Sequence, residues 1–510
     1  MRKSDMQGLW AIRRRFTTSK SLILFISFLA ISVYFSMSLL CSPTGRRRPQ
    51  GPAIATVKFD TYPHRTEAPL NYTVYGCTGT CSTLYDEKEE DHEQPPGATC
   101  PEYFRWIHED LKPWAREGIT RESLERARMG AYFRLVIVNG KAYVEKYRDS
   151  YQTRDVISLW GFLQLLRKYP GKVPDLELMF DCADWPEFDE NGVDAANGTD
   201  QLPLLFPKLV LFRYCGSDDT NYITFPDWTF WGWPELNIKP WDDLLKDIKE
   251  GNKRSRWIDR EPYAYWRGNP FVHEVRHQLM RCNISYKQKH DWSILLYPLN
   301  WTEELGSEFK ATNVANQCHH RYKIYIEGRA WSVSGKYIFV CDSPTLYVKS
   351  RYYDFFTRSM MPMQHFWPIK DDDQCKSIKF AVEWGNIHKQ KAQEIGKAAS
   401  EFMQEKVKME YVYDYMFHLL NEYAKLLKFK PTIPQDAVEV CSETLACSQE
   451  GLHRKFMEES LVKSPRRRPC AMPPPYDPPS LNAILRRKSN SFKQVGVWEK
   501  SYWNKQPKHK

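Results

Sequence analysis

Residues 322–341, YKIYIEGRAWSVSGKYIFVC, predict a β-strand that ends at a glycine turn and is followed directly by a helix. The same alternation recurs along most of the chain, and strands that alternate with helices indicate α/β layers with parallel sheets. One exception is FRLVIV, Asn139-Gly140, KAYVEKY, which predicts an antiparallel hairpin with a type I′ turn. The other predicted helices are 120–129, 155–168, 241–250, 271–281, 333–340, 378–406 and 412–428, and the other predicted strands are 176–180, 263–266, 323–326 and 345–348.

Length and composition describe a folded protein of two or three domains. Of its 510 residues, 42% are hydrophobic and 14% aromatic, whereas disordered chains are poor in aromatic residues. The net charge of +10 lies at the ends: residues 1–50 carry +8, residues 464–510 carry +9, and residues 51–463 carry −7. A mildly acidic body lacks the basic surface that follows a phosphate backbone, so no nucleic acid is expected as a partner.

The amino-terminal charge surrounds an uncharged apolar run at residues 21–41. A helix of about 20 residues crosses a bilayer, so the run predicts a single membrane anchor, with residues 1–20 as a cytosolic tail. A cleaved signal peptide is the alternative, but its apolar centre is normally shorter and ends in small residues. Residues 42–98 are rich in Pro, Thr, Gly and acids and predict a lumenal stem.

The cysteines support a lumenal body independently. Thirteen are present, and twelve remain when Cys41 is assigned to the anchor, an even number that favours disulfides in an oxidising compartment. Their spacing does not match a zinc site. A type II protein without a terminal retrieval signal is expected in the Golgi membrane rather than in the endoplasmic reticulum. Four sequons predict surface glycosylation, at Asn71, Asn197, Asn283 and Asn300.

Ligands of open α/β sheets bind beyond the carboxyl ends of strands, and three such segments carry suitable chemistry. In DCADWP, residues 181–186, Asp184 is placed to act as a general base, although it could instead cap the turn before Pro186. In YWRGNP, residues 265–270, Arg267 offers a guanidinium for a phosphate and Gly268 allows close approach of the backbone. An ordinary turn with a surface arginine is the alternative there.

The third segment is the opening stretch itself. Gly328, Arg329, Ser332 and Lys336 stand where a strand passes into a helix, so backbone N–H groups and two cations are expected to face an anion. The glycine spacing is neither that of a dinucleotide-binding fingerprint nor that of a P-loop. A capped helix without a ligand is the alternative.

These segments resemble glycosyltransferase family 90, the Rumi-type protein O-glucosyltransferases, and most closely its plant branch. The resemblance covers about residues 100–430 and is carried by PDLELMFDCADWP, NYITFPDWTFWGWPE, AYWRGNP, HRYKIYIEGRAWSVSGKYIFVCDS and YYDFFTRSMMPMQHFWPI. It implies an α/β fold of GT-B type, in which two Rossmann-like domains face a cleft. It also implies inverting transfer of glucose or xylose from a UDP-sugar to a hydroxyl of a protein or cell-wall glycan, without a metal or other cofactor.

The resemblance also assigns parts of the chain. Residues 99–250 are expected to form the acceptor-side domain and residues 251–430 the donor domain with its closing helices. Composition alone, which turns Pro-rich and basic beyond Pro431, predicts an irregular tail at residues 431–510. Asp184 is implied as the general base. The implied donor-binding residues are Arg267, Gly328, Ser332 and Lys336, to which the residue pattern at the strand ends adds Gly268 and Arg329. Cys318 and Cys341 are implied to form a disulfide.

Other residues leave alternatives open. Trp228 and Trp231, in the aromatic block 227–234, could stack on sugar rings on the acceptor side or belong to a core cluster. Asp371-Asp372-Asp373 contains an Asp-x-Asp metal motif but is more typical of a solvated loop, and His319 and His320 are more typical of structural residues. A glycoside hydrolase would need a second acid beside Asp184, from Asp181 or Glu187. A membrane-anchored carbohydrate-binding protein without turnover is the non-enzymatic alternative.

Overall fold

The structure is a computed structural model that describes residues 98–184, 209–284, 291–300, 304, 309, 313–464 and 468–506. All of them belong to one structural unit, Pro63–Lys510. Within this described part of the chain, no helix is both long enough and apolar enough to cross a membrane. The predicted tail, anchor and most of the stem lie outside the described residues and stay predictions.

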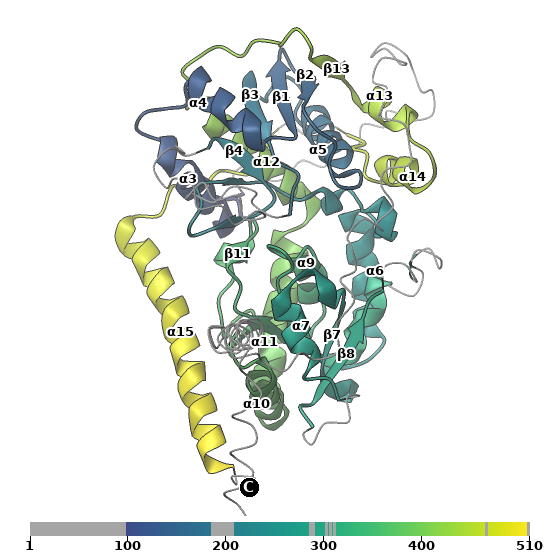
Figure 1. Cartoon of the computed structure of the whole chain (residues 1–510), viewed down its shortest axis with the longest axis vertical. Coiled ribbons are helices and arrows are strands. Elements are labelled where there is room, and N and C mark those ends of the chain that lie inside the picture. The colour runs from purple at the N-terminus through teal and green to yellow at the C-terminus, as the bar shows by residue number, and fades with distance from the viewer. Residues whose placement is uncertain are drawn as a thin grey trace, which may run out of the picture. The chain divides into compact units, whose positions relative to one another are not determined.

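The first sheet contains six strands in the order β13-β2-β1-β3-β4-β6 (Figure 1). The predicted hairpin is confirmed, with Asn139 at φ 51° and Gly140 at φ 73°, the left-handed pair that a type I′ turn requires. β1 runs antiparallel to β2 and to β3, whereas β3, β4 and β6 are parallel. This sheet is therefore mixed rather than parallel. Its strands are β1 (Phe133–Val138), β2 (Lys141–Lys146), β3 (Leu176–Phe180), β4 (Leu211–Arg213), β6 (Ile223–Thr224) and β13 (Val438–Val440).

The second sheet contains five strands in the order β12-β10-β9-β7-β8, and every neighbouring pair is parallel. Parallel strands need a crossover between them, and short helices provide several of these. The predicted alternation of strand and helix is confirmed in this half. The strands are β7 (Glu261–Gly268), β8 (Ile294–Pro298), β9 (His320–Tyr325), β10 (Thr345–Val348) and β12 (Trp367–Ile369), and the helices include α7 (Glu274–Met280), α9 (Ser334–Val340) and α10 (Gln374–Ile387).

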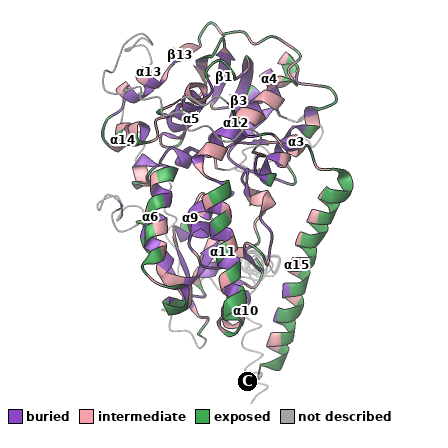
Figure 2. Ribbon diagram, turned by 180° about the vertical axis from the view of Figure 1, so that it is seen from behind, coloured by how far each residue is buried: buried purple, intermediate pink, exposed green. Residues whose placement is uncertain are grey.

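Apolar side chains of each sheet enter a separate buried cluster. One cluster includes Leu135, Leu178 and Phe180 of the first sheet, and the other includes Ala264 and Ile324 of the second. Helices α5 (Arg154–Lys168) and α12 (Met409–Ala424) belong to the first cluster. Figure 2 shows β1, β3 and α5 mostly buried, and α15 mostly exposed.

The predicted helix 378–406 is two helices. α10 ends at Ile387 and α11 (Lys389–Lys406) begins after His388, whose ring stacks on Trp384 at 4.5 Å and whose Nδ1 lies 2.9 Å from the Trp384 carbonyl oxygen. A side chain that occupies the backbone acceptors of the last turn ends the helix there. The break could not be predicted from apolar spacing, which continues across it.

The prediction of an irregular tail at 431–510 is wrong. β13 completes the edge of the first sheet, pairing with β2, and is followed by α13 (Ser442–Cys447), α14 (Gly451–Glu459) and the 28-residue α15 (Pro478–Lys505). Asp477 caps α15 by accepting a hydrogen bond from the Ser480 N–H, and Pro478 occupies its first position. Val495 and Glu499 are buried, and Glu499 pairs with Lys370 at 3.2 Å. Val495 belongs to a core cluster, and Leu481, Phe492 and Tyr502 pack against the clusters while partly buried. The basic, Pro-rich composition did not indicate these contacts.

Three disulfides join described cysteines: Cys100–Cys470, Cys282–Cys375 and Cys318–Cys341. The pairing of Cys318 with Cys341 agrees with the expectation from the family resemblance. Cys182, Cys215 and Cys441 are free, and the first two are buried. The even number of cysteines therefore did not mean that all of them pair.

Candidate active site

Asp184 lies just beyond β3 and is held by a buried arginine. The Arg154 guanidinium donates two hydrogen bonds to its carboxylate, from Nη1 to Oδ1 at 2.6 Å and from Nη2 to Oδ2 at 3.2 Å. Arg154 is 4% exposed, and its guanidinium also lies 4.3 Å from the centre of a Trp228 ring. The Asp184 side chain remains 39% exposed. A fixed carboxylate that still reaches solvent is suited to accept a proton from a bound hydroxyl.

Asp181 does not form a carboxylate pair with Asp184. Its side chain is nearly buried and pairs with Arg213 at 3.2 Å, while its Oδ1 accepts a hydrogen bond from the Ala183 N–H. Arg213 also donates to the Ala183 carbonyl oxygen at 3.3 Å. These contacts rigidify the chain leading to Asp184. They leave Asp181 unsuited as the second acid of a glycoside hydrolase, and Glu187 lies outside the described residues.

At the end of β7, Arg267 and Gly268 have distinct surroundings. Arg267 forms an ion pair with Glu304 at 2.6 Å and keeps 22% of its side chain exposed. Gly268 packs against the Trp266 ring, where a Cβ atom would lie only 2.7 Å away. The glycine is therefore required by packing within its own strand, whatever ligand approaches it.

Beyond β9, the glycine turn brings backbone and hydroxyl groups together. Gly328 is buried and Arg329 is exposed. The Ser332 N–H donates to the Tyr325 hydroxyl at 3.1 Å, and its Oγ lies 2.8 Å from the Ser334 Oγ. The backbone N–H of Ser332 is therefore already engaged. The turn offers a ligand the hydroxyl groups of Ser332 and Ser334 rather than the free backbone N–H groups that were expected from sequence.

Lys336 does not face the turn. It is 2% exposed, and its ammonium donates to both carboxylate oxygens of Asp227, at 3.0 and 2.9 Å. Burial lowers the pKa of Lys336, and the nearby Asp227 carboxylate opposes that shift. The contact ties α9 to the aromatic block, whereas a direct contact with a diphosphate had been expected.

Arg276, on α7, was missed in the sequence. It is hydrogen-bonded to four oxygens, none of them a carboxylate: the carbonyls of Asn269 (3.2 Å), Ile326 (3.3 Å) and Glu327 (2.8 Å) and the Ser332 hydroxyl (3.2 Å). Burial lowers the pKa of Arg276 to about 10, although Tyr325, Asp184 and Glu327 oppose the shift. Arg276 thus links the ends of β7 and β9 and lies close enough to Asp184 to interact with it electrostatically.

The ends of the two sheets meet through aromatic and backbone contacts. The Trp331 ring lies 5.8 Å from Tyr214 and 6.4 Å from Trp228. The short strands β5 (Gly216–Ser217) and β11 (Tyr352–Tyr353) pair nearby. The segments carrying Asp184 and Ser332 are therefore adjacent, as a reaction between their ligands would require.

Trp228 and Trp231 belong to the core. They are 1% and 0% exposed, and the Trp231 Nε1 donates to the Tyr413 hydroxyl at 3.0 Å. Trp231 also fills the space above Gly161, where a Cβ atom would lie 2.6 Å from its ring. Neither ring face is available to a sugar, so the prediction of acceptor-side stacking by these residues is wrong.

The sequons differ in accessibility. Asn300 is exposed. Asn283 is 7% exposed, donates to the Leu296 carbonyl oxygen at 3.0 Å and accepts from the Leu296 N–H at 3.2 Å. Asn283 is therefore not the surface site that was predicted. Asn71 and Asn197 lie outside the described residues.

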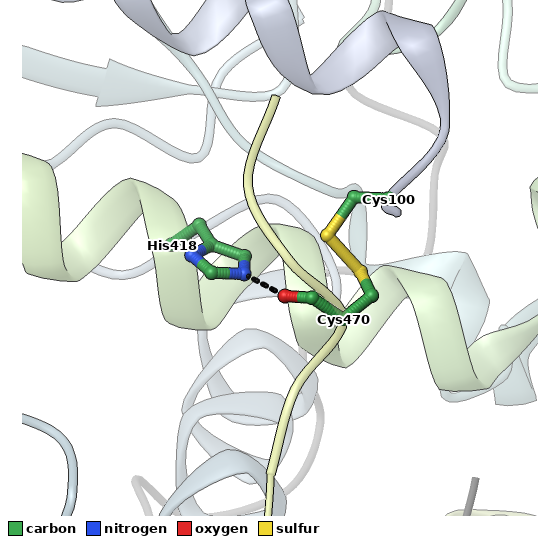
Figure 3. Close-up of side chains that lie close together, drawn as sticks. All are labelled: Cys100, His418 and Cys470. Atoms are coloured by element: carbon green, nitrogen blue, oxygen red, sulfur yellow. Dashed lines mark hydrogen bonds between the residues drawn. A yellow bond between two sulfur atoms is a disulfide. The ribbon is translucent and has the colours of Figure 1, made fainter. Parts of the chain in front are cut away.

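The candidate metal ligands have other roles. Cys100, His418 and Cys470 lie within ligand distance of one another, but Figure 3 shows both sulfurs joined in a disulfide and the His418 Nε2 bonded to the Cys470 carbonyl. Asp373 of the acidic triplet pairs with Lys376 at 2.8 Å. His320 stacks on Tyr265 at 4.2 Å, and burial lowers its pKa to about 4, as expected of a structural histidine.

Comparison with known proteins adds an independent line of evidence. A family model described as Glycosyl transferase family 90 matches residues 96–499. A protein named O-glucosyltransferase rumi homolog, from Aedes aegypti, is 24% identical over 371 residues, which cover 70% of this chain and 86% of that protein. Protein O-glucosyltransferase 1 from Homo sapiens is 24% identical over 362 residues, covering 67% and 85%. O-glucosyltransferase rumi from Drosophila melanogaster is 22% identical over 351 residues, covering 66% and 80%.

Proposed function

Because the chain belongs to glycosyl transferase family 90 and is a glycosyltransferase, we propose that it transfers glucose from UDP-glucose to a hydroxyl group of a protein with inversion at the anomeric carbon. Proteins similar to it are named O-glucosyltransferases and protein O-glucosyltransferases. The observation that carries the mechanism is the proximity of an exposed carboxylate, Asp184, to a half-buried cation, Arg276, that hydrogen-bonds to no carboxylate of the described residues.

Asp184 is the proposed general base. The acceptor oxygen attacks the anomeric carbon while the bond from that carbon to the diphosphate oxygen breaks, and the hydroxyl proton passes to the Asp184 carboxylate. UDP leaves with the bonding electron pair. A single displacement needs one base, and the bidentate contact with Arg154 holds the carboxylate in one orientation. Arg154 is a positioning residue in this scheme.

The donor diphosphate is proposed to bind beyond β7 and β9. Arg276 and the Ser332 hydroxyl supply a positive charge and a donor there, and both can stabilise the charge that develops on the departing phosphate. Arg267, Gly268, Gly328 and the exposed Arg329 line the same strand ends and are proposed to contribute. Lys336 does not contact the diphosphate in this scheme; its ion pair with Asp227 stabilises the position of α9 beside the turn. No metal is required in this scheme.

The architecture is proposed to be of GT-B type, with two Rossmann-like domains. The two sheets, their separate apolar clusters and the adjacency of their strand ends support this proposal. A single-pass type II protein with a lumenal body, in the Golgi or endoplasmic reticulum, is proposed from the apolar run at 21–41. Disulfides in the body are consistent with an oxidising compartment.

The function is tested by a donor and acceptor screen with the purified lumenal portion. UDP-glucose and UDP-xylose are each supplied with a panel of serine-containing protein domains and cell-wall glycans, and UDP release is measured. We expect UDP release with UDP-glucose and a protein acceptor. Release with UDP-xylose or with a glycan acceptor would reassign the donor or acceptor. Binding of acceptors without release in any combination would favour a carbohydrate-binding protein without turnover.

A further inference from the structure

The turn that precedes α5 exposes an aromatic ring beside the proposed base. Tyr151 is 41% exposed. The Arg154 guanidinium lies 5.0 Å from the centre of its ring, and the same guanidinium holds the Asp184 carboxylate. The Arg154 side chain therefore contacts both the Tyr151 ring and the Asp184 carboxylate, and Tyr151 and Asp184 both reach solvent.

The backbone of this turn is held in an unusual conformation. Gln152 has φ 57°, in the left-handed region that a non-glycine residue rarely occupies. Such conformations persist where the surrounding contacts over-determine them, and they concentrate at functional sites. The residue between the exposed ring and the helix start is therefore a candidate for functional strain.

Four hydrogen bonds hold the turn in place. The Thr153 N–H and hydroxyl donate to Glu235 Oε1 at 2.8 and 2.7 Å, and the Trp233 Nε1 donates to Gln152 Oε1 at 2.9 Å. On the other side, the Ser150 hydroxyl donates to Asp155 Oδ1 at 2.7 Å. A ring on so well anchored a turn loses little conformational freedom when a ligand packs on it.

We propose that Tyr151 is a specificity-determining residue that packs against the protein acceptor next to its reacting hydroxyl. A single exposed aromatic residue needs no explanation by itself, but the ring here is presented on a strained, anchored turn and contacts the arginine that holds the base. This inference rests on the proposed function, because it places the acceptor at Asp184. Trp228 and Trp231 cannot supply this surface, since both are buried.

The alternative role for Tyr151 is to shield Arg154 from water. A shield would affect stability and every step that depends on Asp184, including hydrolysis of the donor by water. An acceptor platform would affect only the use of the acceptor. The two roles therefore differ in the kinetic parameter that they change.

The test compares Tyr151→Ala and Tyr151→Phe with the wild type and with Met129→Ala, which truncates a similarly exposed apolar side chain outside the site. The acceptor is the serine-containing protein domain that gives the fastest UDP release with the wild type. Acceptor KM, kcat, UDP-glucose KM, donor hydrolysis without acceptor, and Tm are measured. We expect Tyr151→Ala to raise the acceptor KM about tenfold, the scale of one lost aromatic contact. Tyr151→Phe and Met129→Ala should stay within about twofold of the wild type.

Two outcomes overturn the inference separately from the proposed function. An unchanged acceptor KM in Tyr151→Ala, with normal transfer by the wild type, would remove Tyr151 from the acceptor site. An equal fall in transfer and in acceptor-free hydrolysis would assign it the shielding role instead. If the wild type released no UDP with any donor and acceptor, the proposed function and this inference would both fail.

Discussion

Beyond β3 and β4, the buried arginines Arg154 and Arg213 each face a carboxylate, whereas beyond β7 and β9 the half-buried Arg276 hydrogen-bonds, among the described residues, to carbonyl and hydroxyl oxygens alone. The first edge is therefore electrically balanced. At the second edge, the Arg276 guanidinium has hydrogen-bond acceptors, but none of these acceptors is an anion that balances its positive charge. Removing a guanidinium from water without an anion is costly, and the lowered pKa of Arg276 reflects that cost.

The difference indicates which ligand each edge accepts. A balanced edge with one exposed carboxylate suits a neutral hydroxyl that must lose a proton. An edge with uncompensated positive charge suits an anion such as a diphosphate, whose binding completes the missing ion pair. The difference in charge balance therefore supports the proposal that acceptor and donor bind at separate edges.

The strongest test of this comparison is Asp184→Asn. Loss of a general base lowers kcat by about 10²- to 10⁴-fold, and we expect a loss in this range in the UDP-release assay. UDP affinity measured by calorimetry should change little, because the donor edge is intact. Transfer at the wild-type rate would remove Asp184 from the reaction.

The control for this variant concerns folding. Asp184→Asn leaves the buried Arg154 without an anionic partner. Because the Asp184 side chain is 39% exposed and solvent screens the pair, the cost is about 1–3 kcal/mol. The double variant Arg154→Met/Asp184→Asn removes the stranded charge, so its Tm should recover relative to the single variant. Activity must stay low in both variants. Recovery of activity together with Tm would show that the single variant had only lost its fold.

The second test compares two arginines of the donor edge. Arg276→Met should raise the Kd for UDP about 10- to 100-fold, the range for a lost hydrogen bond to a charged group. Arg267→Met should raise it less, because Glu304 already balances that charge. Arg256→Met, an exposed arginine paired with Asp259, is the matched control. A larger effect at Arg267 than at Arg276 would reverse the assignment of the two residues.

A third test concerns Asp354, a buried acid that interacts electrostatically with Lys336. Burial raises the pKa of Asp354 to about 6, although the Thr357 backbone and Lys336 oppose the shift. The folded state therefore binds this proton more tightly than the unfolded chain, and stability is lost as the pH rises from about 4 through 6. Asp354→Asn removes this loss while keeping an oxygen for the Phe356 and Thr357 N–H groups.

We expect Asp354→Asn to stabilise the protein by about 2–3 kcal/mol at pH 7, with the gain disappearing near pH 4. Thermal unfolding at the two pH values measures it. Asp373→Asn, at a half-exposed acid paired with Lys376, is the control and should change little. A stability gain of the same size at both pH values would mean that titration of Asp354 is not its cause.

The smallest expected effect is that of chelation. The charge that stabilises the leaving diphosphate is proposed to come from Arg276 and its neighbours, so UDP release should be unchanged by EDTA. A loss of activity that Mn²⁺ or Mg²⁺ restores would contradict this scheme. It would instead support metal binding by the acidic triplet at residues 371–373.

Much of the second half could be predicted from its sequence, because a parallel sheet with short crossovers leaves a local pattern. The strands near 263–266, 323–326 and 345–348 were placed correctly, although β7 and β9 extend further. β4, β6 and β13 were missed because they are two or three residues long. Strands so short are formed by pairing with a distant neighbour, as β13 does with β2, and local residue patterns do not reveal them.

The site was predicted in part for a similar reason. Asp184 and the glycine turn stand in compact segments, but Arg154 and Arg276 are isolated arginines. Their partners lie 30 residues away at Asp184 and 56 residues away at Ser332. The only local signal for Arg154 was a charge at the start of an otherwise apolar helix. Conversely, Lys336 and Trp231 fit a functional pattern by type, and only tertiary contacts reveal that they are buried.

The Cys100–Cys470 disulfide spans 370 residues, and together with β13 it sets the order in which the protein can be completed during synthesis. A ribosome delivers Cys100 and the β1–β2 hairpin early, but the edge strand and the cysteine partner emerge only after the entire donor half. The amino-terminal half must therefore remain unfinished until nearly the whole chain has been made. A protein truncated after residue 430 would expose the edge of β2 and the thiol of Cys100. Exposed strand edges and incomplete folds promote aggregation and are recognised by cellular quality control.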